Sequence, residues 1–125
     1  MKPHACPCGN KDYAACCGRY HAGKAAPDAQ SLMRSRYSAY ALMREDYLLA
    51  TWHPDTRPAT LDLAADSTKW LGLKILAHTV ESPDDATVEF IARYRIAGRG
   101  YRLHEISRFV RIDGRWLYLN GEFPK

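Results

Sequence analysis

The sequence has no cysteine after residue 17, no long apolar run and no repeated segment. No stretch approaches the ~18 consecutive apolar residues of a membrane-spanning helix, so we expect no membrane protein. Residues 1–6 also lack the apolar core of a secretory signal peptide, which leads us to expect a cytoplasmic protein. At 125 residues, with 46% hydrophobic and 26% charged side chains, the composition is typical of one globular domain with a short appendage.

All four cysteines lie within one twelve-residue window, at Cys6, Cys8, Cys16 and Cys17. In a reducing cytosol such a cluster favours a metal site over a disulfide framework. Disulfides within either close pair would also close very small, strained rings. Four thiolates are a common ligand set for zinc, and four protein ligands leave no open position for water, so we expect a structural zinc ion.

The identity of the fourth ligand depends on the local helix. Neighbouring side chains on a helix point ~100° apart, so the last two cysteines reach one ion only where a helix ends. We expect Asp12 to cap a short helix that ends at Cys16. If this helix continues, His21 replaces Cys17 as the fourth ligand, and His4 is a more remote candidate.

The chain divides into three segments by composition. Residues 1–21 are rich in cysteine and glycine and are too short to bury a core, so they predict a zinc knuckle. Residues 22–28 predict a linker, because they are small and polar and include a proline. Residues 29–125 carry the apolar periodicity of the main domain.

The first half of the main domain has a helical pattern. Asp28 is a typical N-cap residue, and apolar residues recur at spacings of three and four through 29–41. Ser35 and Ser38 fall on the opposite, polar side of this helix. A second short helix is predicted over 46–52, followed by a loop over 54–68.

The second half has the alternation of β-strands. Four strands are predicted, over 71–77, 88–96, 101–112 and 115–119. The turns between the last three are predicted at Gly98–Gly100 and Asp113–Gly114. Helices followed by an antiparallel meander predict an α+β fold with the helices packed on one face of the sheet.

The stretch Cys6-Pro7-Cys8-Gly9 with Tyr13-Ala14-Ala15-Cys16-Cys17 resembles the SEC-C motif. Seven residues separate its second and third cysteines, one fewer than in the usual motif. This zinc peptide is best known from the C-terminal tail of the preprotein translocase ATPase, where it contacts a chaperone and the ribosome. The resemblance implies a protein or ribosomal partner for the knuckle.

Four further segments resemble the YchJ-like family of uncharacterised bacterial proteins. They lie at 32–37, 51–54, 70–73 and 105–109, and together with the knuckle they extend the resemblance over the whole chain. The family implies a fold like nuclear transport factor two, in which a curved antiparallel sheet wraps around helices to form a cone. It implies no particular reaction.

A cone of this kind often holds a ligand between its sheet and its helices. Glu105 shares a strand face with Leu103 and Phe109, so its carboxylate needs a partner or a raised pKa. It is either salt-bridged to a helix arginine, Arg34 or Arg36, or is available as a general base. These two arginines are two residues apart on a helix, so we expect one to point inward and the other to be exposed.

Other residues are weaker candidates for the pocket. Trp52 and His53 either frame its mouth or serve as a core residue and a capping group, and Tyr37 has the spacing of a core residue. The full set of candidate pocket residues is Arg34, Arg36, Tyr37, Trp52, His53, Glu105, Ser107 and Arg108.

The positive charge is concentrated in the C-terminal third. From Ala86 onward, seven arginines and one lysine accompany four acids, whereas the first 85 residues are neutral. This basic set predicts either a solvated sheet face or a face that binds RNA or another polyanion. Its strand arginines are Arg93, Arg95, Arg102, Arg108, Arg111 and Arg115.

Three functions follow from these features. The first is a zinc-binding interaction or adaptor protein whose α+β domain is a scaffold or a small-ligand receptor. The second is an enzyme acting on a small anionic molecule in the cone, with Glu105 as base. The third is an RNA-binding protein. An open cavity that touches Glu105, with the pKa of this carboxyl raised, favours the enzyme, whereas a filled cone with an exposed knuckle favours the adaptor.

Overall fold

The computed structural model describes residues 5–63 and 67–124. Within these residues, three α-helices precede a four-stranded antiparallel sheet with the strand order β1-β2-β3-β4. This order confirms the predicted α+β class. The elements are α1 (Cys17–His21), α2 (Ala29–Ala41), α3 (Glu45–Ala50), β1 (Lys69–Ser82), β2 (Asp85–Ile96), β3 (Arg99–Ile112) and β4 (Arg115–Glu122).

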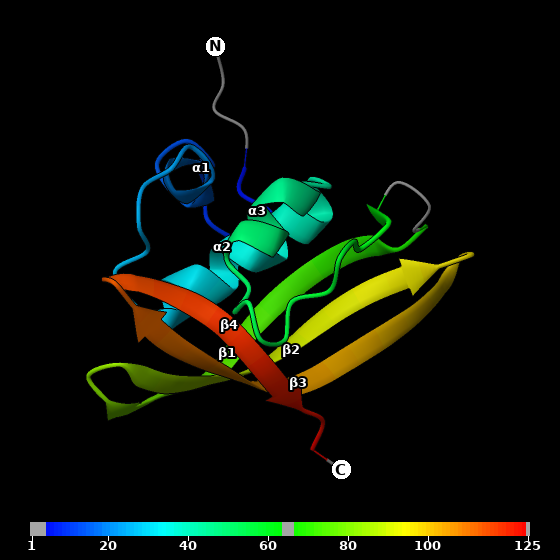
Figure 1. The fold of residues 1–125 in the computed structure, drawn as a ribbon. Helices are drawn as coiled ribbons and strands as arrows, with labels where there is room; N and C mark the ends of the chain where they lie inside the picture. The colour runs from blue at the N-terminus through cyan, green and yellow to red at the C-terminus, as the bar shows by residue number, and fades with distance from the viewer. Residues whose placement is uncertain (1–4, 64–66, 125) are drawn as a thin grey trace.

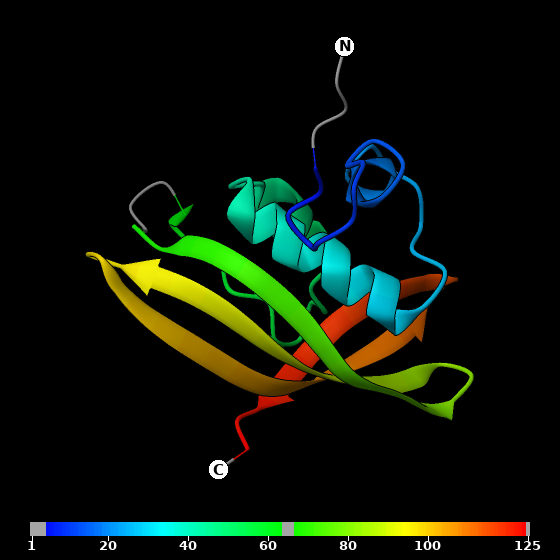
Figure 2. The same ribbon diagram turned by 180° about the vertical axis from the view of Figure 1, so that it is seen from behind.

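The sheet curves around the central helix α2 (Figures 1 and 2). Helix α2 contacts β1, β2 and β4, and the helices α1 and α3 lie on its side away from the sheet. Strand β1 contains three register shifts against β2, and such bulges bend a strand and increase its twist. No helix in the described part of the chain is long and apolar enough to cross a bilayer.

Helix α2 begins where the sequence predicts. Asp28 has an extended backbone, and its Oδ1 accepts a 2.7 Å hydrogen bond from the Ser31 backbone N–H, which confirms the N-cap. The side of α2 that carries Ser35 and Ser38 is polar but not exposed, because both serines are fully buried. The cysteine-rich segment and α3 cover that side of the helix, so α2 is enclosed on both faces.

Helix α3 ends at Ala50, two residues earlier than predicted. The chain that follows pairs with β4 instead of continuing the helix. The His53 N–H donates to the Tyr118 carbonyl and the Tyr118 N–H donates to the Thr51 carbonyl, both at 2.8 Å. This pairing, with an isolated parallel bridge between Trp52 and Tyr118, places the Trp52 side chain beside the sheet.

All four strands are longer than predicted, and the β1–β2 hairpin closes at residues 83–84. The predicted turn at Asp113–Gly114 is confirmed, with φ values of 52° and 78°. The turn predicted at Gly98–Gly100 lies one residue earlier, at Ala97–Gly98, where φ is 52° and 79°. Gly98 supplies the positive φ of this two-residue turn, and Gly100 belongs to β3.

Candidate functional site

The four cysteine sulfurs converge on one point. All lie within 4.8 Å of one another, and none is in a disulfide. Cys16 Sγ is 3.6 Å from Cys8 Sγ and 3.8 Å from Cys17 Sγ. A tetrahedral zinc ion with ~2.3 Å bonds to sulfur requires sulfurs about 3.8 Å apart. The donor set and its spacing therefore fit a tetrahedral metal ion.

A tight loop positions the first two cysteines. The Gly9 N–H donates to the Cys6 carbonyl at 3.0 Å, and the Cys6 N–H donates to the Asn10 carbonyl at 2.9 Å. Gly9 has φ 113°, which a residue with a side chain adopts only with strain. The side-chain amide of Asn10 donates to Cys16 Sγ at 2.9 Å, the kind of outer contact that orients a metal ligand.

The last two cysteines converge because a helix begins between them. Helix α1 starts at Cys17, and the preceding Cys16 has a non-helical backbone with φ −123° and ψ −115°. The predicted helix ending at Cys16 is therefore wrong. Asp12 instead caps a turn, in which its Oδ1 accepts a 3.1 Å hydrogen bond from the Ala14 N–H. Starting the helix here removes the angular conflict between neighbouring cysteines.

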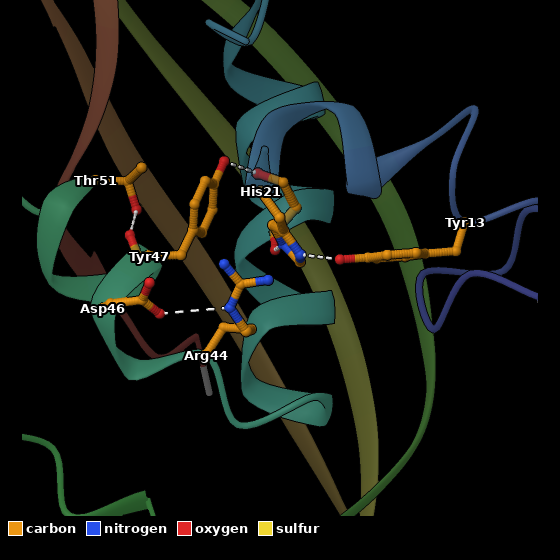
Figure 3. Close-up of polar contacts among 7 residues, drawn as sticks. Tyr13, His21, Arg44, Asp46, Tyr47 and Thr51 are labelled. Atoms are coloured by element: carbon orange, nitrogen blue, oxygen red, sulfur yellow. Dashed lines mark hydrogen bonds and ion pairs between the residues drawn. The ribbon is translucent and has the colours of Figure 1, made fainter. Parts of the chain in front are cut away.

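His21 lies outside the sulfur cluster. Its Nε2 donates to the Ser35 carbonyl at 2.8 Å, so its Nδ1 accepts the 2.6 Å hydrogen bond from the Tyr13 hydroxyl. Figure 3 shows Tyr13 directed at the His21 ring, with Tyr47 on the other side. Both ring nitrogens are engaged, so the structure does not bring His21 in as a fourth ligand. His4 lies outside the described residues.

Burial and hydrogen bonding set the protonation of this region. Desolvation lowers the pKa of His21, so the imidazole is neutral at physiological pH. A hydrogen bond from the Cys17 thiol lowers the pKa of Cys8 to about 4. The same contact raises the pKa of Cys17. The cluster thus contains at least one thiolate at neutral pH, the form that binds metals.

The cysteine cluster is docked on α2. The Arg34 guanidinium donates to the Cys8 carbonyl at 3.2 Å, and Ser38 Oγ lies 3.4 Å from Cys6 Sγ. The prediction of one inward and one exposed arginine is only partly correct. Arg36 points inward and is 4% exposed, but Arg34 is half-buried beneath the cysteine loop. The sequence gives no sign of this contact, because 26 residues separate its partners.

The cone is hollow. A cavity of about 240 Å³ lies between α2 and the concave face of the sheet. Half of its lining residues are aromatic, and the others include one arginine and one glutamate. The lining residues are Met33, Arg36, Tyr37, Tyr40, Trp52, Trp70, Phe90, Ala92, Leu103, Glu105, Ser107 and Tyr118.

Glu105 is the carboxylate in this wall and is 9% exposed. Its Oε2 accepts hydrogen bonds from the Ser107 hydroxyl at 2.5 Å and from the Tyr118 hydroxyl at 3.3 Å. The predicted salt bridge to Arg34 or Arg36 is absent from the ion pairs of the described residues. Hydroxyls from β3 and β4 satisfy the carboxylate instead, and both bind the same oxygen.

Arg36 is the buried cation of the cavity. Its Nη1 donates to the Leu48 carbonyl at 2.8 Å and to Thr51 Oγ1 at 2.7 Å. The guanidinium carbon lies 4.9 Å from the Trp52 ring centroid and 4.8 Å from that of Tyr118. Desolvation lowers the pKa of Arg36, although an arginine remains charged at any physiological pH.

Of the four remaining candidate pocket residues, two line the cavity and two lie outside it. Tyr37 and Trp52 line the cavity, and burial raises the pKa of Tyr37 to about 12. His53 is half-buried beside Asp55 and does not line the cavity, and Arg108 lies on the outer sheet face. Tyr118 was missed, although its alternation with Trp116 along β4 indicates an inward position.

Comparison with known proteins agrees with this architecture. The family described as "YchJ, middle NTF2-like domain" matches residues 28–121. A UPF0225 protein of Bordetella parapertussis is 58% identical over 96% of this chain and 93% of its own. A UPF0225 protein of Methylibium petroleiphilum is 57% identical over 96% of this chain and 89% of its own.

Two solved structures have the same fold. One is the solution structure of a SEC-C motif containing protein from Rhodopseudomonas palustris, 36% identical, with a TM-score of 0.84 over 97% of this chain and 99% of that one. The other is the crystal structure of a SEC-C motif containing protein from Psychrobacter arcticus, 31% identical, with a TM-score of 0.84 over 99% of this chain and 85% of that one. The chain therefore belongs to the UPF0225 family of YchJ-like proteins, with an N-terminal SEC-C motif and an NTF2-like domain.

Proposed function

We propose that this protein binds a small ring-bearing molecule in its cone and holds a structural zinc ion in its cysteine cluster. The observation that carries the ligand proposal is the hollow cone, whose wall contains Glu105 and Arg36 without an ion pair between them. If the α+β domain served only as a scaffold, side chains would fill the space between α2 and the sheet, because protein interiors are close-packed.

The two charged groups indicate the chemistry of the ligand. Within residues 5–63 and 67–124, both hydrogen bonds to Glu105 end on Oε2, and Oε1 suits a ligand hydroxyl or N–H. Among the described residues, Arg36 donates two hydrogen bonds, both from Nη1, and its further guanidinium N–H groups suit an acidic ligand group. A molecule with one acidic group and one donor complements both.

The size and surface of the cavity narrow the class of ligand further. Its 240 Å³ lies just below the ~300–1,000 Å³ of typical drug-sized pockets, so it suits a small metabolite. Rings of tyrosine, tryptophan and phenylalanine form its walls, and these stack on flat unsaturated molecules. The best-fitting class is therefore a small, planar, acidic ring compound.

Calorimetry with three related probes tests this assignment. 4-Hydroxybenzoate carries both the acid and the donor, benzoate lacks the donor, and phenol lacks the acid. We expect 4-hydroxybenzoate to bind at least tenfold more tightly than either truncated probe. Glu105→Gln should remove the advantage over benzoate, whereas Glu122→Gln, at an exposed position on β4, should leave it unchanged. Equal affinity for all three probes, or none, would contradict the proposal.

The cavity also bears on the functions predicted from the sequence. An open cavity that touches Glu105 supports ligand binding, and it leaves catalysis with Glu105 as base as the next step to examine. The predicted contact of the knuckle with a protein or ribosomal partner stays a prediction, and so does a cytoplasmic location.

The zinc proposal is supported by the four converging sulfurs and the amide that donates to Cys16. A bound zinc ion would cross-link the loop and α1, and four protein ligands would exclude water from it. Elemental analysis of purified protein should find about one zinc per chain. A thiol reagent should modify the four cysteines rapidly only after a chelator is added. Rapid labelling without the chelator would overturn this assignment.

A further inference from the structure

The strand pairing brings two acid-free stretches of sequence together. Neither residues 67–80 nor residues 90–104 contain aspartate or glutamate. The first stretch covers most of β1, and the second spans the β2–β3 hairpin. The pairs Lys69–Arg95 and Arg93–Arg102 place their cations at one end of the sheet. We call this region the basic sheet end, and its cations are Lys69, Lys74, Arg93, Arg95, Arg99 and Arg102.

Two arginines at the opposite end of the same sheet form ion pairs. Arg108 forms an ion pair with Asp85 at 3.0 Å, and Arg111 forms one with Asp84 at 2.9 Å. Among the ion pairs of the described residues, none includes a cation of the basic sheet end. Of the strand arginines that the sequence groups as one basic set, Arg108 and Arg111 are therefore ion-paired, whereas Arg93, Arg95 and Arg102 belong to the unpaired basic sheet end.

Three cations of the basic sheet end line a hollow on the outer sheet face. Arg93 lies directly opposite Arg102, an arrangement of like charges that destabilises an antiparallel pair. Both arginines and Lys74 line a hollow of about 500 Å³. Gly72, which pairs with Arg93, has no side chain to fill it, and no atom lies within 4 Å of the position a Cβ would take. A bound anion would relieve this repulsion.

We propose that the basic sheet end binds the phosphate backbone of single-stranded nucleic acid. Its cations extend over three strands that lie ~4.8 Å apart, and alternate residues on a strand are ~7 Å apart. One phosphate cannot contact a set so widely spaced, whereas a chain of phosphates can. Arginine forks suit phosphate oxygens. Leu71 lines the same hollow and is 51% exposed, which offers an apolar surface to a base.

Fluorescence anisotropy with a labelled single-stranded RNA of ~20 nucleotides tests the proposal. With about four phosphate contacts, affinity should fall roughly 50-fold between 50 and 200 mM salt. The double variant Arg93→Gln/Arg102→Gln should bind at least tenfold more weakly at 50 mM salt and show a shallower salt dependence. The matched control Arg108→Gln/Arg111→Gln removes the same charge from the ion-paired end and should change binding less than threefold.

Three outcomes would overturn the proposal. Equal losses in both double variants would show that net charge alone attracts the RNA. Displacement of the RNA by 1 mM inorganic phosphate would assign the hollow to a single phosphate group. Absence of RNA binding, with binding to vesicles of phosphatidylcholine and phosphatidylglycerol, would assign the surface to acidic lipid. None of these results depends on a ligand in the cone, so the two proposals succeed or fail separately.

Discussion

Gly121 lies directly against the carboxylate of Glu105. A Cβ at position 121 would lie 2.6 Å from Cδ of Glu105 and would also collide with Oε2. Gly121 pairs across the sheet with Ser107, the residue whose hydroxyl binds this carboxylate. The missing side chain on β4 therefore makes room for the buried carboxylate on β3.

Gly121→Ala should displace Glu105 from its position in the cavity wall. We expect a loss of about 1–3 kcal/mol in the free energy of unfolding, because the added methyl group overpacks a buried site. We also expect at least tenfold weaker binding of 4-hydroxybenzoate. Thermal denaturation and calorimetry on the same samples measure both effects.

Gly100→Ala is the matched control, since position 100 has open space around its Cβ and no positive φ. It should leave the free energy of unfolding within about 0.5 kcal/mol of the unaltered protein. If Gly121→Ala is equally neutral and keeps full affinity, then Glu105 does not occupy the place described here.

Ser38→Ala tests whether α2 supports the cysteine cluster. The Ser38 hydroxyl is fully buried beside Cys6 Sγ, so its removal should weaken a contact that orients a ligand. Loss of such an outer contact typically lowers metal affinity by about 10–100-fold. Competition with a chromogenic chelator measures this change. Ser31→Ala, on the same helix, should keep the metal affinity of the unaltered protein.

Local signals made part of the fold predictable. The cap at Asp28 and the turn at Asp113–Gly114 depend on neighbouring residues, so the sequence predicts them correctly. The burial of Ser35 and Ser38 could not be predicted in this way. Contacts to segments that lie 12 and 32 residues away bury the polar side of α2.

The candidate site was likewise predictable only in part. The four cysteines are visible as a cluster in the sequence, and the structure brings their sulfurs together. The partner of Glu105 was predicted wrongly, although Ser107 is only two residues away on the same strand face. The charge of Glu105 suggested an arginine as its partner. Arg36 instead donates to the Leu48 carbonyl and to Thr51 Oγ1 at the end of α3.

The stability of the protein should depend on pH through His21. Desolvation, aided by the nearby charge of Arg44, lowers the pKa of His21 below its usual 6.5. The unfolded chain therefore binds more protons below pH 6.5, and the free energy of unfolding falls as pH decreases through this range. One such group contributes up to about 1.4 kcal/mol per pH unit. Urea denaturation at intervals between pH 7.5 and 5 measures the slope.

Acid would also release a bound metal, and it would do so equally from the unaltered protein and from His21→Gln. Comparing these two proteins therefore isolates the effect of His21 titration. Glutamine can accept from Tyr13 and donate to the Ser35 carbonyl but does not titrate. The variant should therefore show the shallower decline below pH 6.5. Identical slopes would mean that His21 is not the group responsible.

The planar guanidinium of Arg36 should stabilise the fold beyond the effect of its charge. Arg36→Lys keeps the positive charge but loses the fork that lies between the Trp52 and Tyr118 rings. We expect a loss of about 2 kcal/mol in the free energy of unfolding, because the Leu48 carbonyl is left without a well-placed donor. Arg57→Lys, at an exposed arginine near the same helix end, should cost less than about 0.5 kcal/mol. If both variants are equally stable, charge alone accounts for the contribution of Arg36 to the free energy of unfolding, and its planar contacts with the Trp52 and Tyr118 rings contribute nothing.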